Sequence, residues 1–460
     1  MKILFCSSEM VPFAKTGGLA DVSGALPQAL EKKGCLVKVA LPKYKGIKVP
    51  GKIARLGEAI DVFLIENEQY FNRSGLYGEA GGDYDDNLLR FSFFCQQVLD
   101  LLKQQNFCPD IIHCNDWQSA LIPVYLKTKL NQDDFFKQTK TIFTIHNLAY
   151  QGLFAKEQFP QTNLDWSLFN MQALEFYNQV NLLKGGLLFA DFITTVSPTY
   201  AQEIQLPKFG CGLDGVLRQR KENLSGIING LDYTAWNPAT DDKIFQKYGP
   251  GNLELKAVNK KGLQRELNLT EDENIPLFGI VTRLAEQKGI ELIISALEKM
   301  AKQKLQFVLL GTGDNKYHEA LELIKQKKYK NFSINLRFDA TLAQKIYAGC
   351  DIFLMPSNYE PCGLGQLISL KYGTIPVVRK TGGLADTVED YQSKTGQGNG
   401  FVFEEYSGKK MFQAIERSMA VYKKRNQWLK LMRRAMQYDF SWAASAEKYI
   451  KLYRQALNER

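Results

Sequence analysis

The heptapeptide KTGGLAD occurs twice in this chain, at residues 15–21 and again at residues 380–386. Each copy follows a short apolar run typical of a β-strand, at 3–6 and 375–378, and precedes a stretch typical of a helix start. Paired glycines at such a junction let backbone N–H groups approach a ligand closely, and a helix N-terminus favours an anion. Two such loops, one near each end of the chain, predict two similar domains that grip one phosphorylated ligand.

Short apolar runs alternate with helical patterns between the two copies. Further strand candidates lie at 37–41, 111–113, 141–145, 192–196, 226–228, 277–281, 307–310, 332–336 and 352–355, and the run before the second copy extends over 374–378. This alternation predicts an α/β fold with parallel sheets and crossover helices. Ligands of such sheets bind at the carboxyl ends of the strands, so the residues that follow each run are the candidate functional positions.

The length of 460 residues exceeds what one ordinary core supports, so two domains are expected. The polar stretch 237–251, which contains Pro and Gly, is typical of a linker. We therefore expect an N-terminal domain at 1–240 and a second domain at 241–438. A last helix at 439–460 is expected to cross back onto the first domain, with hinges near 237–251 and 438–442.

Composition narrows the functional classes. No apolar run approaches the length of a membrane span, and no secretion signal precedes the first strand, so a cytoplasmic protein is expected. The eight cysteines are scattered without a Cys-x-x-Cys pair, as in a reduced protein without a zinc knuckle. The net charge of +9 is dispersed along helical surface patterns. We expect neither a nucleic-acid partner nor a membrane partner.

Two charged motifs follow strands in the second half. Arg283 and Lys288 are cations five residues apart, expected on a loop ahead of a helix, where both can face one phosphate. Glu360 lies on a Pro- and Gly-containing segment before a helix at 366–372, where a carboxylate can accept hydrogen bonds from sugar hydroxyls. The alternative for Arg283 and Lys288 is a helix-capping segment with solvated charges. The alternative for Glu360 is a charge that complements a helix dipole.

Polar residues also end strands in the first half. Asp116 and His146 follow predicted strands and suit the recognition of hydroxyl groups, although a buried core histidine is the alternative for His146. Asp83 and Asp85 form an Asp-x-Asp pattern, but no other ligand cluster supports a cation, so we expect no metal site. Tyr84 between them is a candidate substrate-lining residue. Neither a P-loop nor a Gly-x-Gly-x-x-Gly fingerprint is present.

Together these blocks resemble the bacterial glycogen synthase and plant starch synthase family. The similarity covers nearly the whole chain and includes KTGGLADV (15–22), YDDNLLRF (84–91), HCNDWQSAL (113–121), TIHNLAYQG (144–152), INGLDYTAWNP (228–238), TRLAEQKG (282–289) and MPSNYEPCGLGQLISLKYGTIPVVRKTGGLADTV (355–388). The resemblance implies a GT-B fold, with two Rossmann-like domains whose parallel sheets face each other across a deep cleft. It also implies a retaining transferase that moves glucose from ADP-glucose to the non-reducing end of an α-1,4-glucan.

The resemblance assigns roles to individual positions. Lys15, Arg283 and Lys288 match phosphate-binding cations, which would neutralise the departing ADP without a metal or other cofactor. Glu360 matches the glutamate that contacts the donor glucose. The remaining implied substrate-binding positions are Gly17, Gly18, Asp21, Tyr84, Asn229, Cys362, Gly363, Leu364, Thr381, Gly382 and Gly383, and His146 and Asp116 would lie around the glucose and acceptor. Asn115 departs from the histidine of many bacterial relatives.

Retention of configuration often uses a carboxylate nucleophile, but no clear candidate stands out here. A same-face displacement, in which the leaving phosphate helps to deprotonate the acceptor hydroxyl, is the preferred hypothesis. Because Lys15 lies in the first domain and Arg283 in the second, a donor that contacts both would draw the domains together. The oligomeric state does not follow from the sequence.

Alternatives remain at this point. A GT-B transferase that uses UDP-glucose differs in donor preference. A non-catalytic glucan-binding protein would have lost the cations and the carboxylate, which are all present. A nucleotide-dependent oxidoreductase would carry the missing glycine fingerprint. A phosphorylase-like enzyme would hold a lysine-bound pyridoxal phosphate, which ultraviolet absorbance of the purified protein detects.

Overall fold

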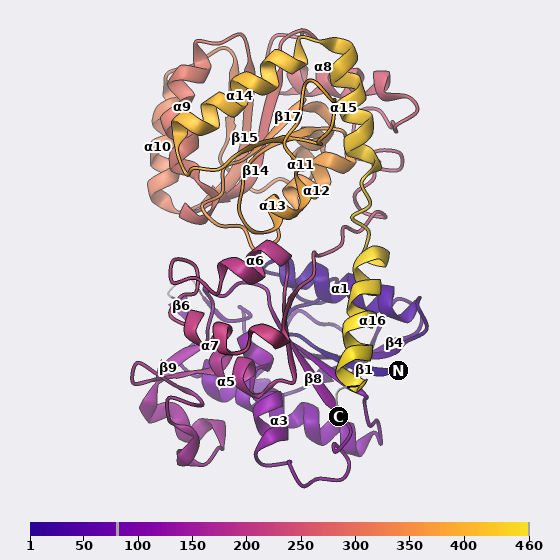
Figure 1. Ribbon diagram of the computed structural model, residues 1–460, viewed down its shortest axis with the longest axis vertical. Helices are drawn as coiled ribbons and strands as arrows, with labels where there is room; N and C mark the ends of the chain where they lie inside the picture. The colour runs from indigo at the N-terminus through magenta and orange to yellow at the C-terminus, as the bar shows by residue number, and fades with distance from the viewer. Residues whose placement is uncertain (80–81, 459–460) are drawn as a thin grey trace. The chain divides into compact units, whose positions relative to one another are not determined.

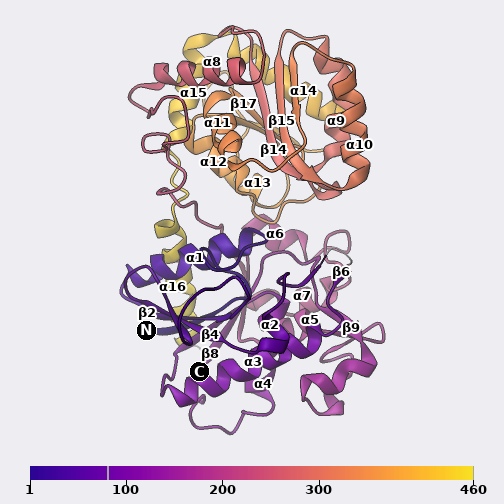
Figure 2. The ribbon, with the colours of Figure 1, turned by 180° about the vertical axis from the view of Figure 1, so that it is seen from behind.

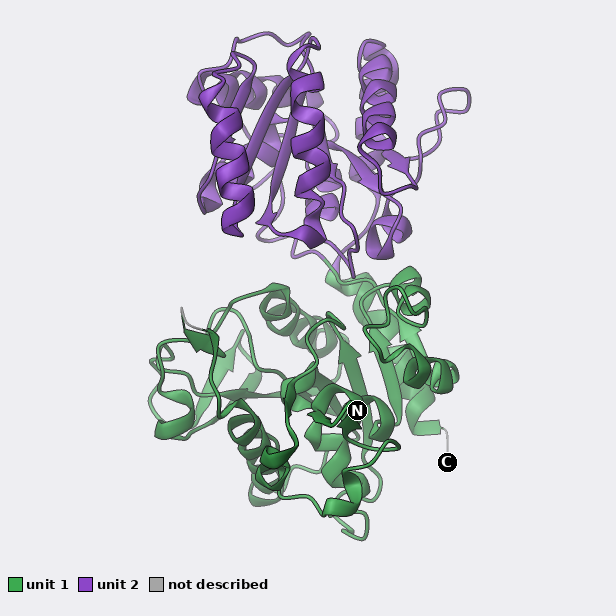
Figure 3. Cartoon of the chain, turned by 90° about the vertical axis from the view of Figure 1, so that its left-hand side faces the viewer, with its two compact units in different colours: residues 1–230, 442–460 green, residues 231–441 purple. Residues whose placement is uncertain are grey.

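The computed structural model describes residues 1–79 and 82–458 of the chain. The chain forms two compact units, coloured separately in Figure 3. Unit 1 comprises residues 1–230 and 442–460, and unit 2 comprises residues 231–441. Each unit has its own large hydrophobic core. The chain therefore passes from one unit to the other twice, at 230–231 and at 441–442.

Unit 1 is built on an eight-stranded sheet with the order β13-β12-β8-β7-β1-β2-β4-β3. Neighbouring strands are parallel except β3 and β4. The strands are β1 (Lys2–Cys6), β2 (Leu36–Pro42), β3 (Ile53–Leu56), β4 (Ile60–Ile65), β7 (Ile111–Asn115), β8 (Lys140–Ile145), β12 (Phe192–Thr195) and β13 (Leu224–Gly226). The chain builds outward from β1 first on one side and then on the other, so the loops after β1 and β7 lie at a topological switch point.

The rest of unit 1 surrounds this sheet (Figures 1 and 2). Two small antiparallel sheets consist of β5 (Gly78–Glu79) with β6 (Gly82–Asp83), and of β9 (Leu153–Ala155), β10 (Glu175–Phe176) and β11 (Gln179–Asn181). The helices are α1 (Gly18–Glu31), α2 (Glu68–Phe71), α3 (Asn87–Gln104), α4 (Leu121–Lys127), α5 (Leu182–Phe189), α6 (Pro198–Glu203), α7 (Asp214–Gln219) and α16 (Trp442–Asn458). Short 3-10 turns are η1 (Trp117–Ser119), η2 (Lys156–Thr162), η3 (Trp166–Leu168) and η4 (Lys221–Asn223).

Unit 2 has a six-stranded, fully parallel sheet with the order β16-β15-β14-β17-β18-β19. The strands are β14 (Leu277–Leu284), β15 (Gln306–Gly313), β16 (Phe332–Asn335), β17 (Ile352–Met355), β18 (Ile375–Arg379) and β19 (Phe401–Phe403). Numbered from β14, this is the 3-2-1-4-5-6 order of a Rossmann fold, and its switch point lies between β14 and β17. The strands are mostly buried on both faces, which explains their continuous apolar runs.

Helices cover both faces of this second sheet (Figures 1 and 2). They are α8 (Lys256–Glu266), α9 (Ile290–Ala301), α10 (Asn315–Gln326), α11 (Ala340–Gly349), α12 (Gly365–Lys371), α13 (Gly382–Thr387), α14 (Gly408–Tyr422) and α15 (Arg425–Gln437), with 3-10 turns η5 (Leu253–Leu255) and η6 (Glu286–Lys288). None of the helices described here is both long and apolar enough to span a membrane.

The stretch 237–251, expected to be a linker, is instead part of unit 2, and the unit boundary lies before it. Ile244 and Tyr248 are buried in the core of unit 2. The Tyr248 hydroxyl donates to the backbone oxygen of Tyr372 at 2.7 Å, and the buried Asp241 carboxylate accepts from the Tyr372 hydroxyl at 2.6 Å. The apolar residues spaced among the polar ones anchor this stretch, so its Pro and Gly mark turns within a folded unit.

The last helix belongs to unit 1. Helix α16 packs beside α1, and its Tyr453 hydroxyl is 2.6 Å from Nδ1 of the buried His113 on β7. The Ser445 hydroxyl donates to the backbone oxygen of Ile228 at 2.7 Å. The chain thus returns to the first unit after completing the second.

Candidate active site

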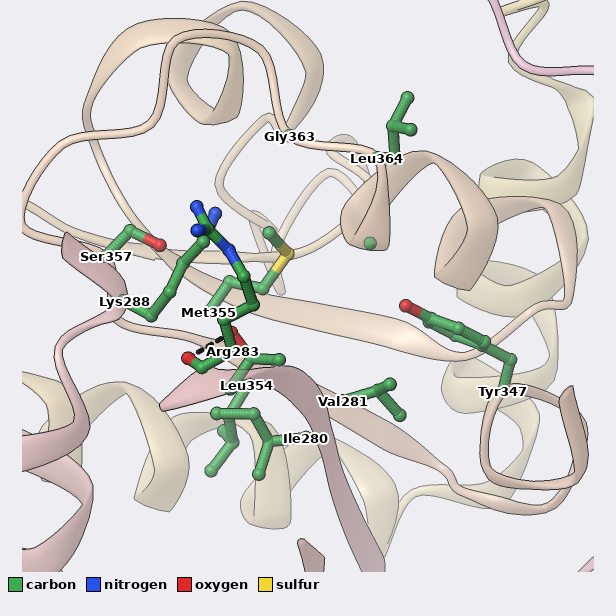
Figure 4. Close-up of a pocket in the computed structure, with 12 residues that line it drawn as sticks. Ile280, Val281, Arg283, Lys288, Tyr347, Leu354, Met355, Ser357, Gly363 and Leu364 are labelled. Carbon is green, nitrogen blue, oxygen red and sulfur yellow. Dashed lines mark hydrogen bonds between the residues drawn. The ribbon is translucent and has the colours of Figure 1, made fainter. Parts of the chain in front are cut away.

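A pocket of about 240 Å³ lies at the carboxyl ends of β14 and β17 in unit 2 (Figure 4). It is lined by Ile280, Val281, Thr282, Arg283, Lys288, Tyr347, Leu354, Met355, Ser357, Gly363, Leu364 and Gly365. Figure 4 shows Arg283, Lys288 and Ser357 at one end and Tyr347 at the opposite end. Because β14 and β17 flank the switch point of the sheet, this pocket is where a Rossmann-like unit binds its ligand.

Arg283 is the penultimate residue of strand β14 and does not lie on a loop, because that strand extends to Leu284 and pairs Arg283 with Thr312 of β15. The arginine side chain is exposed. Its guanidinium has no hydrogen-bond or ion-pair partner among residues 1–79 and 82–458. A rigid strand therefore presents an uncompensated cation to the pocket.

Lys288 is held differently. Its Nζ lies 2.9 and 2.7 Å from the two carboxylate oxygens of Glu360, whose side chain is only 5% exposed. The Ser357 hydroxyl donates to Oε2 of Glu360 at 2.9 Å. The sequence-predicted cation and carboxylate thus form one hydrogen-bonded cluster at the pocket, in which each fixes the position of the other.

The segment that carries Glu360 is fixed from behind by Arg379 of β18. Its guanidinium donates to the backbone oxygens of Ser357, at 2.7 Å, and of Asn358. On the other side, the Gly383 N–H donates to the backbone oxygen of Glu360 at 3.0 Å. The loop is therefore bound to two neighbouring elements and presents Glu360 in one orientation.

The glycines of the second KTGGLAD copy serve this loop. A Cβ on Gly382, whose φ is +42°, would lie 2.0 Å from the backbone oxygen of Glu360, and one on Gly383 would lie 2.0 Å from that of Cys362. Thr381 is the buried N-cap residue of α13, and Cys362 is buried. Glycine is required here for close packing of the helix start against the protein's own backbone.

The first KTGGLAD copy has different surroundings. A Cβ on Gly17 or Gly18 would meet no atom within 4 Å, so a ligand can approach this backbone. Lys15 Nζ forms an exposed ion pair with Asp21 at 2.6 Å. Both copies begin a helix within the glycine pair, at the second glycine, Gly18, in the first copy and at the first glycine, Gly382, in the second. The two copies do not share their contacts.

Asp116 and His146 meet at the carboxyl ends of β7 and β8 in unit 1. The backbone N–H of His146 donates to Oδ1 of Asp116 at 2.8 Å. Desolvation, with a smaller contribution from the nearby Glu9 charge, raises the pKa of Asp116 to about 7, and Asp116 has a positive φ of 54°. Desolvation lowers the pKa of His146 to about 3, so its imidazole is neutral at pH 7.

The neutral imidazole has a defined tautomer. The Asn115 amide nitrogen donates to the backbone oxygen of Cys6 at 2.9 Å, so Oδ1 of Asn115 is the acceptor for Nε2 of His146, also at 2.9 Å. His146 therefore carries its proton on Nε2, and Nδ1 is left as an acceptor for a hydroxyl group.

Two further predicted residues, Asn229 and Tyr84, belong to unit 1. Asn229 is buried, and its Oδ1 has no hydrogen-bond partner among the described residues, which suits a ligand hydroxyl. The Tyr84 hydroxyl donates to Glu79 at 3.0 Å, and the guanidinium groups of Arg73 and Arg90 lie over its ring at 4.8 and 4.9 Å. Its ring is therefore held by the protein itself.

Sequence reasoning did not single out Ser357, Arg379, Glu9 or Tyr77. Ser357 and Arg379 stand at strand ends within the long motif at 355–388, which was a usable signal. Glu9 and Tyr77 belong to no charged or glycine-rich pattern, and only the fold brings them together, with the Tyr77 hydroxyl 2.8 Å from Oε1 of Glu9. Within the described residues, no group of three or more His, Cys, Asp or Glu side chains is arranged to hold a metal ion.

Comparison with known proteins places the chain in a family. The model of the starch synthase catalytic domain matches residues 2–219, and that of glycosyl transferases group 1 matches residues 263–434. The chain is 52% identical to a glycogen synthase from Geotalea daltonii and 51% identical to glycogen synthase 2 from Geobacter metallireducens, in both cases over the full length of both proteins. The chain belongs to the glycogen synthase and starch synthase family of glycosyltransferases.

A solved structure of this glycosyltransferase family agrees with the fold. The catalytic domain of starch synthase IV from Arabidopsis thaliana, bound to ADP and acarbose, is 35% identical and superposes with a TM-score of 0.89, with 99% of each chain covered. Sucrose-phosphate synthase from Thermosynechococcus elongatus, at 19% identity and a TM-score of 0.65, shares the fold. The two Rossmann-like units are thus those of a GT-B glycosyltransferase, as the sequence motifs predict.

Proposed function

We propose that this protein transfers glucose from ADP-glucose to the non-reducing end of an α-1,4-glucan, with retention of configuration and without a metal. The observation that carries the proposal is the pocket between the ends of β14 and β17. It combines the exposed Arg283 with the Lys288–Glu360 pair in a chain that is about half identical to glycogen synthases over its full length.

The charges of the pocket suit a nucleoside diphosphate sugar. The Arg283 guanidinium is free to make paired hydrogen bonds to phosphate oxygens. Lys288 adds a second cation. The carboxylate of Glu360, which is paired with Lys288, can accept hydrogen bonds from sugar hydroxyls with its remaining lone pairs. Lys15 contributes a third cation from unit 1.

These cations act where charge develops. As the bond between the glucose C1 and the phosphate oxygen breaks, negative charge grows on ADP, and fixed cations stabilise it more in the transition state than in the ground state. The acceptor 4-hydroxyl oxygen forms the new bond to C1 on the same face. Its proton passes to the departing phosphate oxygen, so ADP leaves with the proton and the reaction balances without a further reactant.

Unit 1 supplies acceptors for hydroxyl groups. The neutral His146 has Nδ1 available, and the Oδ1 of Asn229 has no partner among the described residues. Neutral acceptors of this kind orient sugar hydroxyls without adding charge next to a reacting centre. We assign them, with Asp116, to the glucose and the acceptor end of the glucan.

Product analysis tests the proposal. Glucose labelled with ¹⁴C in ADP-glucose is incubated with glycogen and the purified protein, and the polymer is then digested from its non-reducing ends by an exo-acting enzyme specific for α-1,4 linkages. We expect the label to enter the polymer and to be released early in the digestion, with one ADP formed per glucose transferred. Label that resists this digestion, or transfer from UDP-glucose alone, would contradict the proposal.

A further inference from the structure

A buried carboxylate with no role so far in the proposed function, that of Glu9, lies in the loop after β1 in unit 1. The residue is only 4% exposed. One of its oxygens accepts the backbone N–H groups of Thr16, at 2.6 Å, and Gly17, at 2.9 Å. The other accepts the hydroxyls of Thr16, at 2.6 Å, and Tyr77, at 2.8 Å. All four of these groups, from three residues, donate, so the site is matched to a carboxylate.

This carboxylate occupies the place that a ligand anion would take. Thr16 and Gly17 immediately precede helix α1, and Gly17 is its N-cap residue. The N-terminus of a helix attracts negative charge through its free N–H groups and its dipole. In this protein Glu9 supplies that charge internally. The N–H groups of Thr16 and Gly17 are therefore engaged by the protein, which leaves the Gly18 backbone and the Lys15 side chain as the groups of this loop that a phosphate can reach.

The side chain of Lys15 is weakly held, whereas the backbone of the next residue, Thr16, is firmly held. Its ion pair with Asp21 joins groups whose side chains are 51% and 39% exposed, and such pairs contribute little. A ligand phosphate can replace Asp21 at small cost. The backbone next to Lys15 is fixed by the hydrogen bonds of Thr16 to the buried Glu9.

A second contact ties this loop to another segment. The Tyr77 hydroxyl, which donates to Glu9, also lies 2.8 Å from the Ser8 hydroxyl. Tyr77 and Thr16 both line a groove of about 480 Å³ in unit 1. Glu9 thus links two residues that line the groove, Thr16 and Tyr77, through one carboxylate.

We propose that Glu9 is a positioning residue that fixes the loop of Lys15, so that the Lys15 ammonium reaches the diphosphate of the donor in one defined place. The inference rests on the role of Lys15 proposed above. Glu9 acts mainly through Lys15, with a smaller electrostatic effect on Asp116, and is assigned no contact with the donor. Misplacing a reacting or binding group by about 1 Å can cost roughly a hundredfold in rate, so removal of this anchor has a large kinetic effect.

A double-mutant cycle tests the coupling. Initial rates of glucose transfer are measured for the wild type, Glu9→Ala, Lys15→Ala and the double variant, each shown to unfold cooperatively. We expect Glu9→Ala alone to lower kcat by roughly ten- to a hundredfold. In the Lys15→Ala background, we expect Glu9→Ala to change kcat by less than about twofold, because residues that act through one another are not additive.

If Glu9→Ala does not fold, more conservative variants test the same coupling. In Glu9→Gln the amide oxygen can accept both backbone N–H groups, while the hydroxyls of Thr16 and Tyr77 turn to accept from the amide nitrogen, so we expect it to retain most of the turnover. Tyr77→Phe removes one of the four hydrogen bonds and is expected to show a smaller loss that also vanishes in the Lys15→Ala background. Glu58→Ala, at an exposed carboxylate of the same unit, is the matched control.

The outcomes separate the inference from the proposed function. If Lys15→Ala transfers glucose at the wild-type rate, the assigned role of Lys15 is wrong. If Lys15→Ala is impaired and Glu9→Ala lowers the rate by the same factor in both backgrounds, the role of Lys15 stands and the positioning role of Glu9 is overturned. Normal turnover in Glu9→Ala overturns it as well.

Discussion

At the scale of single residues, the two cations of the unit 2 pocket are in different states. Arg283 is exposed and has no partner among the described residues, whereas Lys288 is paired with the buried Glu360. Removing one member of a buried ion pair leaves an uncompensated charge, which costs about 3–5 kcal/mol of stability. The loss of Lys288 therefore combines a catalytic effect with a structural one, and the loss of Arg283 isolates the catalytic effect.

We predict that Arg283→Ala lowers kcat by about 10²–10³ with a smaller change in the affinity for ADP-glucose, since its interaction strengthens as the phosphate departs. Its melting temperature should equal that of the wild type. Lys288→Ala should lose a similar factor in kcat and also melt several degrees lower. Steady-state kinetics, donor binding by calorimetry and thermal melts check this. Near-normal turnover of Arg283→Ala would place that residue away from the phosphate.

Asp116 gives a prediction for pH. Its pKa is raised to about 7 in the folded protein, mainly by desolvation, from a value near 3.8 in the unfolded chain. Between these values the folded state binds a proton that the unfolded state does not. The stabilising contribution of this proton is complete below about pH 4 and is lost as the pH rises through 7. Asp116→Asn keeps the shape and removes the titration.

We therefore expect the free energy of unfolding of the wild type, relative to Asp116→Asn, to fall by a few kcal/mol between pH 4 and pH 8. Urea titrations of both proteins across this range measure the difference. A difference that is constant with pH would show that Asp116 keeps an ordinary pKa.

At the scale of elements, one heptapeptide begins a helix twice, one motif position apart, and different segments pack against each copy. The sequence predicted both strand-to-helix junctions, because paired glycines and the apolar runs are local signals. It did not show that Glu360 and Cys362 would contact Gly382 and Gly383, or that Glu9 would lie against Thr16 and Gly17. Those contacts join segments that are brought together only by the sheets.

The glycines provide a matched pair of substitutions. Gly383→Ala would place a Cβ 2.0 Å from the backbone oxygen of Cys362, so the Glu360 loop must move. We expect a large loss of transfer activity and a melting temperature several degrees lower, as for other overpacked sites. Gly18→Ala meets no atom within 4 Å and should melt like the wild type, so any loss of activity in it reports on ligand approach. Equal melting temperatures would contradict this account of the second loop.

Most of the parallel strands were predicted from sequence because strands buried on both faces are continuously apolar. The expected strand at 226–228 lies at Leu224–Gly226, and β14 and β15 extend to Leu284 and Gly313, beyond the apolar runs. A polar residue at the end of a strand can still pair with the neighbouring strand, but it does not extend the apolar run. Arg283 was therefore expected on a loop. Strands β3 and β19 and the small sheet of β9 to β11 were missed because they are short and lack a long apolar run. Strand β4 was also missed, although its run Val62–Ile65 is a usable apolar signal.

At the scale of the whole molecule, the helix with which the chain returns to unit 1 contributes to the core of that unit. Helix α16 packs against α1 and β8, and its Tyr453 hydroxyl is the hydrogen-bond partner of the buried His113 on β7. Desolvation lowers the pKa of His113 to about 3, so this ring is kept neutral and depends on its hydrogen bonds. The family motifs along the chain predicted the activity class, whereas the place where the chain returns follows from this packing.

We predict that Tyr453→Phe, which leaves Nδ1 of His113 without its partner, destabilises unit 1 by about 1–3 kcal/mol. Hydrogen exchange measured by mass spectrometry should show faster exchange in the strands of unit 1 and unchanged exchange in those of unit 2. Tyr150→Phe, at an exposed tyrosine of the same unit, is the control. Equal acceleration in both units would mean that α16 does not stabilise unit 1 selectively.

The central claim is that fixed protein cations, Arg283 and Lys288 with Lys15, stabilise the ADP that leaves during glucose transfer. The most direct test is the initial rate of labelled glucose transfer to glycogen from ADP-glucose and from UDP-glucose, each with EDTA present. We predict rapid transfer from ADP-glucose that EDTA does not diminish, and much slower transfer from UDP-glucose. Loss of ADP-glucose transfer in EDTA, restored by magnesium or manganese, would contradict the claim.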